Sequence, residues 1–163
     1  MNFVELFLNQ EEKIREMSTM ASTIVKEHFD PIIGAAQNDY MIKKFQTVES
    51  IKEQLEHGYR YFFVIKEDKC IGFLAFYPRN NAMYLSKFYL YKNERGKGYS
   101  HNMLDFVVEE SKKLGLHAIE LNVNKNNSAC YAYDKLGFKV IRTEKNDIGS
   151  GFYMDDYVYC YEF

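Results

Sequence analysis

A short turn rich in glycine and basic residues is the part of the sequence best suited to bind an anion. It reads Arg95-Gly96-Lys97-Gly98-Tyr99-Ser100 and lies between an apolar strand pattern and an amphipathic helix pattern. The first N–H groups of a helix have no acceptor inside the helix and carry the positive end of its dipole. The glycines let a ligand approach the backbone, and Arg95 and Lys97 add positive charge. We therefore expect this turn to hold a phosphate or pyrophosphate.

Two phosphate-binding patterns are missing from this turn. The Walker pattern GxxxxGK[ST] does not occur, and His101 stands where the Rossmann pattern GxGxxG has its third glycine. Taken alone, the turn has a second interpretation as a solvated basic loop before a helix, because short turns of glycine and lysine are common.

A second motif follows about 30 residues later, after another strand pattern. Read in order, Arg-x-x-Gly-x-Ser and Asn-x-x-Ala-x-x-x-Tyr-x-Lys-x-Gly-Phe resemble the motifs of the GNAT superfamily of acyl-CoA-dependent N-acyltransferases. The matching positions are Arg95, Gly98, Ser100, Asn126, Ala129, Tyr133, Lys135, Gly137 and Phe138. The order of the predicted helices and strands matches too, so the resemblance covers essentially the whole chain.

The resemblance implies that acetyl-CoA is the co-substrate and that its pyrophosphate binds at the turn just described. It implies that the pantetheine arm runs along Phe88-Tyr89-Leu90, where two parallel strands splay apart and leave backbone groups free for hydrogen bonds. Asn126 and Lys135 belong to the same expected cofactor site. Ser100 departs from the family, which usually has Gly or Ala there, but a small hydroxyl side chain suits a helix start.

The implied reaction is direct attack of a primary amine on the thioester carbonyl. A free alkylamine has a pKa near ~10.4, so the site must remove a proton or bind the small neutral fraction. The leaving thiol has a pKa of ~8.5, and a tyrosine with a pKa near ~10 can protonate it. The resemblance assigns this general-acid role to Tyr133. Spacing alone favours a core position for Tyr133, in a helical stripe with Ala129, Ala132 and Leu136.

Other nucleophiles and bases have weaker support. Cys130 would suit a covalent acyl-enzyme, but a small buried side chain is favoured because no His or Lys partner is near in sequence. Glu94 and Glu120 are candidate bases, although surface charge is the favoured role for each, so the base is unassigned. The four histidines fit no metal-ligand spacing, and no metal is expected.

The C-terminal segment suggests what the acceptor is. A glycine loop, Gly149-Ser150-Gly151, leads into Asp155 and Asp156 with tyrosines on both sides. Carboxylates and aromatic rings suit a cationic amine. The segment also resembles the polyamine (spermidine/spermine-type) N-acetyltransferase branch of the family. The alternative is ordinary sheet packing, because Tyr153 and the later tyrosines share one face of the predicted strand.

Three other functions stay open. The chain could be a non-catalytic acyl-CoA-binding regulatory module, an acetyltransferase acting on a peptide or protein amine, or a binder of another phosphate ligand such as a nucleotide. Thiol release and ligand-dependent thermal stabilisation distinguish them, because a ligand stabilises only the native state that binds it.

Composition excludes several classes of protein. The chain has 163 residues, 47% of them hydrophobic and 27% charged, which fits one globular domain over residues 1–163 and excludes disorder. The net charge of −2 argues against nucleic acid as a partner. Three cysteines without a CxxC pair, no signal-peptide pattern and no long apolar run favour a cytoplasmic protein that does not contact membranes. Tyrosine-rich sheet edges make a homodimer plausible.

The expected elements alternate in type along the chain. We expect strands at 3–8, 61–65, 70–77, 83–91, 118–123, 138–143 and 152–163, and helices at 11–28, 38–57, 101–114 and 127–136. Asp30-Pro31 is expected to stop the first helix, and Thr47 is expected to cap a helix start inside the second helical region. The strand at 83–91 is apolar on both faces and should be central in the sheet. This order predicts a single α/β domain with a GNAT-like, mixed but mostly antiparallel sheet, one splayed parallel pair, and helices on both faces.

Overall fold

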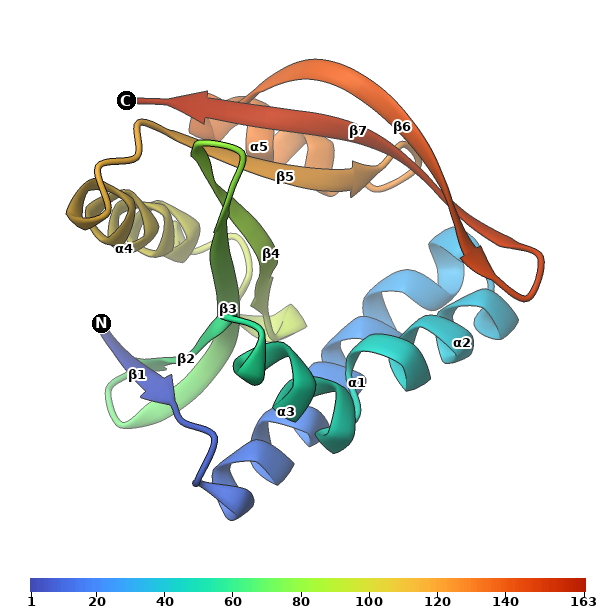
Figure 1. Cartoon of the computed structure of the whole chain (residues 1–163), viewed down its shortest axis with the longest axis horizontal. Helices are drawn as coiled ribbons and strands as arrows, with labels where there is room; N and C mark the ends of the chain where they lie inside the picture. The colour runs from blue at the N-terminus through green and yellow to red at the C-terminus, as the bar shows by residue number, and fades with distance from the viewer. The chain divides into compact units, whose positions relative to one another are not determined.

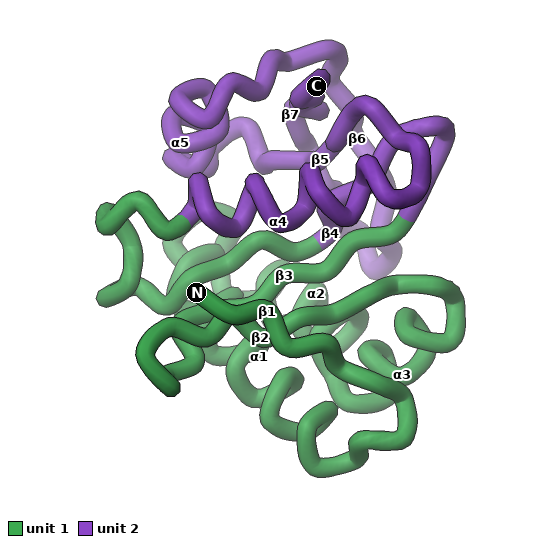
Figure 2. Tube along the Cα trace, turned by 90° about the vertical axis from the view of Figure 1, so that its left-hand side faces the viewer, with its two compact units in different colours: residues 1–77, 87–99 green, residues 78–86, 100–163 purple.

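The computed structural model describes residues 1–163, which divide into two compact units. Unit 1 comprises Met1–Tyr77 and Lys87–Tyr99, and unit 2 comprises Pro78–Ser86 and Ser100–Phe163 (Figure 2). A single domain over the whole chain therefore stays a prediction, and each unit is described by itself below.

The expected elements are present, and several differ in length from the sequence prediction (Figure 1). They are β1 (Asn2–Leu6), α1 (Glu11–Ile33), α2 (Ala35–Phe45), α3 (Val48–Glu56), β2 (Arg60–Lys66), β3 (Lys69–Arg79), β4 (Ala82–Leu90), the short 3-10 turn η1 (Lys92–Glu94), α4 (Tyr99–Lys113), β5 (Ala118–Asn124), α5 (Ala129–Leu136), β6 (Lys139–Gly149) and β7 (Phe152–Glu162).

The strands form a mixed seven-stranded sheet in the order β1-β2-β3-β4-β5-β7-β6. Pairs β1–β2, β2–β3, β5–β7 and β6–β7 are antiparallel, whereas β4 and β5 are parallel. The parallel register joins Met83 to Ile119 and Tyr84 to Glu120, near the start of each strand. The predictions of a mixed α/β fold with a parallel pair and a central β4 are confirmed.

In unit 1, α1 buries one face against the sheet. Ile14, Met17 and Ile24 are fully buried and join a core with Tyr61 and Phe73. Met17 lies three positions after Ile14, and Ile24 lies seven positions after Met17. The three residues therefore share one side of a helix with 3.6 residues per turn.

The prediction that Asp30-Pro31 stops this helix is wrong. The helix continues through Pro31 to Ile33 and ends at Gly34, whose N–H donates to the Asp30 carbonyl at 3.0 Å. Proline removes only its own N–H, and the N–H groups of the following residues can still continue the helix until Gly34, which adopts the positive φ that ends it.

The second helical region consists of two helices rather than one. α2 and α3 are separated at Gln46 and Thr47. The predicted cap at Thr47 is confirmed, because its Oγ1 accepts a hydrogen bond from the Ser50 N–H at 3.2 Å. The Gln46 carbonyl also accepts a hydrogen bond from the Ser18 hydroxyl at 2.6 Å, which ties this corner to α1.

In unit 2, the sheet has two chemically different faces. Along β5, Ile119, Leu121 and Val123 are buried, whereas the alternate residues are polar. Leu121 lies opposite Tyr159 of β7, and the Tyr159 ring contacts Tyr133 of α5 with centroids 6.0 Å apart. Paired residues share a face, so α5 covers the apolar face and the polar residues occupy the other.

None of the helices combines the length and the apolarity that crossing a lipid bilayer requires.

The backbones of β3 and β4 approach each other closely at Gly72. A Cβ atom at this position would lie 2.1 Å from the Tyr89 carbonyl oxygen and 2.9 Å from the Leu90 Cα. Only glycine fits there, because backbone atoms cannot move aside as a side chain can.

We predict that Gly72→Ala destabilises the protein by at least about 2 kcal/mol, because the added methyl group forces the two strands apart. Urea denaturation measures the change. Gly58→Asn is the control, since Gly58 has open space around it and a positive φ that asparagine tolerates. Equal stability of Gly72→Ala and the wild type would contradict the close approach.

Candidate active site

The glycine-rich turn joins the end of β4 to the start of α4, as the sequence predicts. Gly96 and Gly98 adopt φ values of 76° and 81°, and α4 begins at the next residue, Tyr99. No atom lies within 4 Å of a Cβ built on either glycine, so the backbone of the turn is accessible. Such a turn can present N–H groups to an anion.

A buried carboxylate pairs with two lysines, one of which belongs to this turn. Glu94 is only 6% exposed and forms ion pairs with Lys69 of the β2–β3 hairpin at 2.9 Å and with Lys97 at 3.4 Å. The hydrogen bond from Lys69 is the main reason that the pKa of Glu94 is lowered. The prediction of a surface charge at Glu94 is wrong, because the side chain is buried beside these two lysines and positions them.

The Arg95 side chain points back toward the end of β4 and toward α1. Its Nε donates to the Leu90 carbonyl at 3.2 Å, and its Nη1 lies 3.4 Å from Nδ1 of His28 on α1. The Lys66 ammonium lies 5.5 Å from the centre of the Tyr99 ring. The predicted anion-binding residues from Arg95 to Tyr99 therefore all belong to one unit, with Ser100 following in the first turn of α4.

The end of β4 is anchored in the core of unit 1. The Tyr89 ring contacts Phe73 with centroids 5.4 Å apart and Phe29 of α1 with centroids 6.2 Å apart. The next residue after the strand, Tyr91, donates its N–H to the Ile71 carbonyl at 3.0 Å. The stretch Phe88–Leu90 is thus held at a fixed position ahead of the turn.

Lys87 is a polar residue of this strand that sequence reasoning missed. It is 6% exposed, and its ammonium contacts only the Phe45 carbonyl at 3.5 Å and the Phe45 ring at 6.0 Å. Burial without a carboxylate partner lowers the pKa of Lys87 to about 7. A lysine among the apolar residues of a central strand is the sequence signal that would have found it.

In unit 2, Tyr133 lies near the end of α5, partly exposed. Its ring contacts Phe138 edge to face with centroids 5.5 Å apart, besides Tyr159. This packing fixes the ring and leaves part of the side chain accessible, which is compatible with both the core and the general-acid interpretations. Burial, followed by the nearby Cys130 thiol, raises the pKa of Tyr159.

The asparagine motif forms the turn into α5. Asn126 is exposed, whereas Asn127 is buried and its Oδ1 accepts a hydrogen bond from the Ala129 N–H at 2.9 Å. The helix starts at Ala129, two residues later than predicted, and Ser128 is its N-cap residue. Lys135 is exposed in the last turn of α5.

The two carboxylates of the C-terminal segment lie in different environments. Asp155 is half-exposed and forms an ion pair with Lys125 at 3.0 Å. Asp156 is 2% exposed and accepts a hydrogen bond from Nδ2 of Asn122 at 3.3 Å. Adjacent strand residues point to opposite faces, so only Asp156 joins the polar face of the unit 2 sheet.

Asn122 is the centre of a polar network on that face. Its Oδ1 accepts from the Tyr84 hydroxyl at 2.9 Å, and its Nδ2 also donates to Glu144 at 3.3 Å. Arg142 binds Glu144 at 2.9 Å and Glu120 at 3.4 Å. Four neighbouring strands therefore contribute to one set of hydrogen bonds that spacing in the sequence did not reveal.

The carboxylates of this network differ in acidity. Burial is the main reason that the pKa of Asp156 is raised, and the negative charges of Glu144 and Asp155 add to it. The hydrogen bond from Arg142 instead lowers the pKa of Glu144. A cation bound beside Asp156 would relieve the repulsion that raises its pKa.

No group of three or more His, Cys, Asp or Glu side chains is placed to hold a metal ion.

The family model described as "Acetyltransferase (GNAT) domain" matches residues 10–154. The match includes most of both units, and the chain therefore belongs to the GNAT acetyltransferase family. It is an enzyme that transfers an acetyl group from acetyl-CoA. A search of curated protein sequences gives no match.

Solved structures with the same fold cover nearly the whole chain. The PaiA N-acetyltransferase of Thermoplasma acidophilum, solved with coenzyme A, is 19% identical over 100% of both chains with a TM-score of 0.78. An aminoglycoside 6'-acetyltransferase type Ii is 14% identical over 99% of this chain and 97% of its own, with a TM-score of 0.67. A ribosomal-protein-alanine N-acetyltransferase from Brucella melitensis is 17% identical over 98% of this chain and 99% of its own, also with a TM-score of 0.67. At these identities the likeness shows the fold alone.

The depressed pKa of Lys87 predicts a pH dependence of stability. An unfolded lysine titrates near ~10.4 and the folded one near 7, so the unfolded state binds more protons between these values. The free energy of unfolding of the wild type should rise from about pH 7 to about pH 10 through this group, and Lys87→Met should lack this rise. Urea denaturation at several pH values measures it, with the exposed Lys139→Met as control. Parallel pH profiles for Lys87→Met and the wild type would contradict the prediction.

Proposed function

We propose that the protein acetylates the primary amine of a small cationic acceptor, with a polyamine as the first candidate, by direct attack on acetyl-CoA. The observation that carries the choice of acceptor is the carboxylate network around Asn122, which places Asp156, Glu144 and Glu120 on one face of the unit 2 sheet. Glu144 and Glu120 are paired with Arg142, so Asp156 is the carboxylate of this face that an ammonium group would complement.

In this proposal the cofactor binds at the turn and at the strand end before it. The N–H groups from Gly96 to Ser100 and the side chains of Arg95 and Lys97 bind the pyrophosphate. The backbone of Phe88–Leu90 binds the pantetheine arm, and Asn126 and Lys135 complete the cofactor contacts. The open backbone at both glycines and the orientation of Lys97 by Glu94 support this assignment.

The first test is binding and turnover of the cofactor. Calorimetry should detect coenzyme A, with an affinity that falls as salt concentration rises, because the contacts are ionic. Release of free thiol from acetyl-CoA is then measured against spermidine, aminoglycosides, amino acids and peptide N-termini. Absence of CoA binding would refute the cofactor site, and activity on peptide amines alone would refute the small acceptor. Binding without thiol release on any of these amines would refute the proposed class of acceptor.

We assign Tyr133 as the general acid that protonates the leaving thiolate. It is partly exposed, its ring is fixed by Phe138 and Tyr159, and a phenol needs only a small change in acidity to protonate a thiolate. Cys130 is half-buried with its Sγ 3.8 Å from the Asn124 carbonyl, and it has no role in direct transfer.

Tyr133→Phe should lower kcat by roughly 10²–10⁴ and leave the affinity for CoA intact, because only the proton donor is lost. Thiol release and calorimetry measure the two quantities. Tyr131→Phe is the matched control, since Tyr131 lies on the same helix and is 74% exposed. Full activity in Tyr133→Phe would remove this residue from the mechanism.

Within the proposed acceptor site, the two carboxylates of β7 play different parts. Asp156 lies inside the network and would face the acceptor ammonium, whereas Asp155 is paired with Lys125 and would add only to the field around it.

Asp156→Asn should raise KM for a cationic acceptor by about tenfold or more, because a charged hydrogen bond is lost. The raised pKa of Asp156 also determines the direction in which KM changes with pH. Below that pKa the carboxylate is protonated, so KM of the wild type should rise as the pH falls, and KM of the variant should not. Glu162→Gln, an exposed change on the same strand, is the control. A wild-type KM in Asp156→Asn would contradict the acceptor site.

The proposal includes a cytoplasmic location, which the three free cysteines support. A homodimer stays a prediction.

A further inference from the structure

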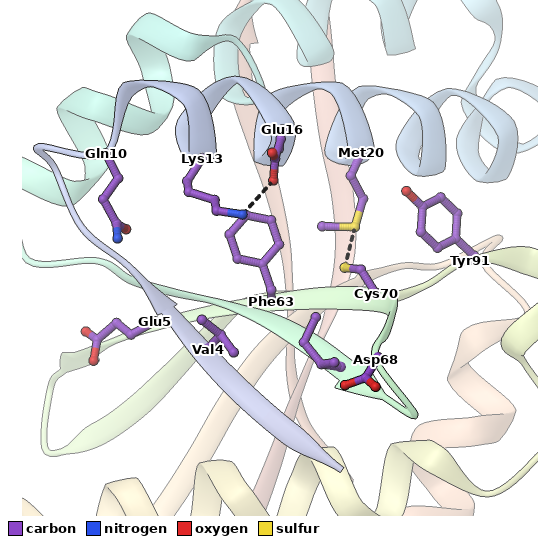
Figure 3. A pocket seen from close by; sticks show the side chains of 11 residues that line it. Val4, Glu5, Gln10, Lys13, Glu16, Met20, Phe63, Asp68, Cys70 and Tyr91 are labelled. Carbon is purple, nitrogen blue, oxygen red and sulfur yellow. Dashed lines mark hydrogen bonds and ion pairs between the residues drawn. The ribbon is translucent and has the colours of Figure 1, made fainter.

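A cavity of about 370 Å³ lies in unit 1 between α1 and the strands β1, β2 and β3 (Figure 3). Its floor is apolar and consists of Val4, Met20, Phe63, Ile65, Cys70 and Tyr91. This volume is at the lower end of the range of small-molecule sites in proteins. None of these residues belongs to the proposed cofactor or acceptor sites.

Charged side chains surround this apolar floor. Lys13 and Glu16 of α1 form an ion pair at 3.3 Å, and Glu5 accepts two hydrogen bonds from Arg60, at 2.9 and 3.0 Å. Asp68, at the tip of the β2–β3 hairpin, also lines the cavity and makes no ion pair. Three carboxylates and one ammonium therefore line the cavity, and the carboxylate of Asp68 is available to a ligand.

The residues of the cavity continue directly into the glycine-rich turn. Lys69 lies between the two lining residues Asp68 and Cys70, and it forms the ion pair with Glu94 that also orients Lys97. The carbonyl of the floor residue Tyr91 accepts a hydrogen bond from the Glu94 N–H at 2.9 Å. A ligand that moves the hairpin tip or Tyr91 therefore acts on Glu94 from two sides.

We propose that this cavity binds a small amine with an apolar body, and that its occupancy changes the affinity of the glycine-rich turn for coenzyme A. The apolar part lies against Phe63 and Met20, and the ammonium lies at Asp68. Carboxylates at the entrance repel an acidic ligand, and an uncharged polar ligand would lose hydrogen bonds to water on the apolar floor. The coupling rests on the proposed function, because it takes coenzyme A as the ligand of the turn.

The thiol of Cys70 lines the cavity and can be labelled by disulfide exchange. Its Sγ lies 3.6 Å from Sδ of Met20 (Figure 3). The protein is equilibrated with 2-mercaptoethanol and one of three symmetric disulfides that leave an aminoethyl, a hydroxyethyl or a carboxyethyl cap on the thiol. Burial raises the pKa of the Cys70 thiol, so exchange is slow and must be followed to equilibrium. Mass spectrometry of peptides gives the fraction of Cys70 that carries each cap.

The aminoethyl cap should exceed the hydroxyethyl cap at Cys70 by about two- to fivefold, the size expected for a partly exposed ion pair. The carboxyethyl cap should be the least abundant. Asp68→Asn should reduce the preference for the aminoethyl cap. Glu109→Gln, an exposed charge removal on α4, should keep it. Equal occupancy of the three caps, or a preference that survives Asp68→Asn, would overturn the site.

Calorimetry with coenzyme A tests the coupling on the same capped proteins. The Kd of the aminoethyl-capped protein should differ at least threefold from that of the hydroxyethyl-capped protein. Identical affinities would overturn the effector role. If coenzyme A fails to bind even the unlabelled protein, the proposed function is contradicted, and the cap preference at Cys70 still decides whether the cavity selects an amine.

Discussion

The close backbone approach between β3 and β4 at Gly72 is the constraint on which the proposed cofactor end of unit 1 depends. Because no side chain separates the strands there, Tyr91 can donate to Ile71 and the chain enters the turn at a fixed position. Lys69, near the start of β3, reaches Glu94 in the same turn. The strand β3 therefore positions both the end of β4 and the charges that follow it.

Buried charge is used differently in the two units. In unit 1, Glu94 is buried but has two lysine partners, whereas Lys87 is buried with only a carbonyl and a ring beside it. In unit 2, Asp156 is buried next to an amide and near a second carboxylate. A buried charge without an opposite charge lowers stability, and such groups are concentrated at functional sites. Lys87 and Asp156 are therefore two positions at which burial of an ionisable group lowers the stability of the fold.

In the proposed function, the acceptor and the cofactor make opposite electrostatic demands on the protein. An anionic cofactor needs exposed N–H groups and cations, which the turn from Arg95 to Tyr99 supplies. A cationic acceptor needs carboxylates, which the network around Asn122 supplies. The turn from Arg95 to Tyr99 belongs to unit 1, and the network around Asn122 belongs to unit 2.

Local sequence patterns were sufficient to predict the order of elements, the glycine turn before α4 and the cap at Thr47. They were also sufficient to predict membership of an acetyltransferase family. These features depend on neighbours in sequence, such as helical periodicity and the backbone freedom of glycine. Tertiary structure decided that α1 continues through Pro31, that Glu94 is buried and that Asp155 and Asp156 separate. It also placed Tyr84, Asn122 and Glu144 in one network and left Lys87 without a carboxylate. The burial of Glu94, the network and the surroundings of Lys87 depend on segments far apart in the chain coming together, and a sequence pattern carries no information about which distant side chain lies opposite.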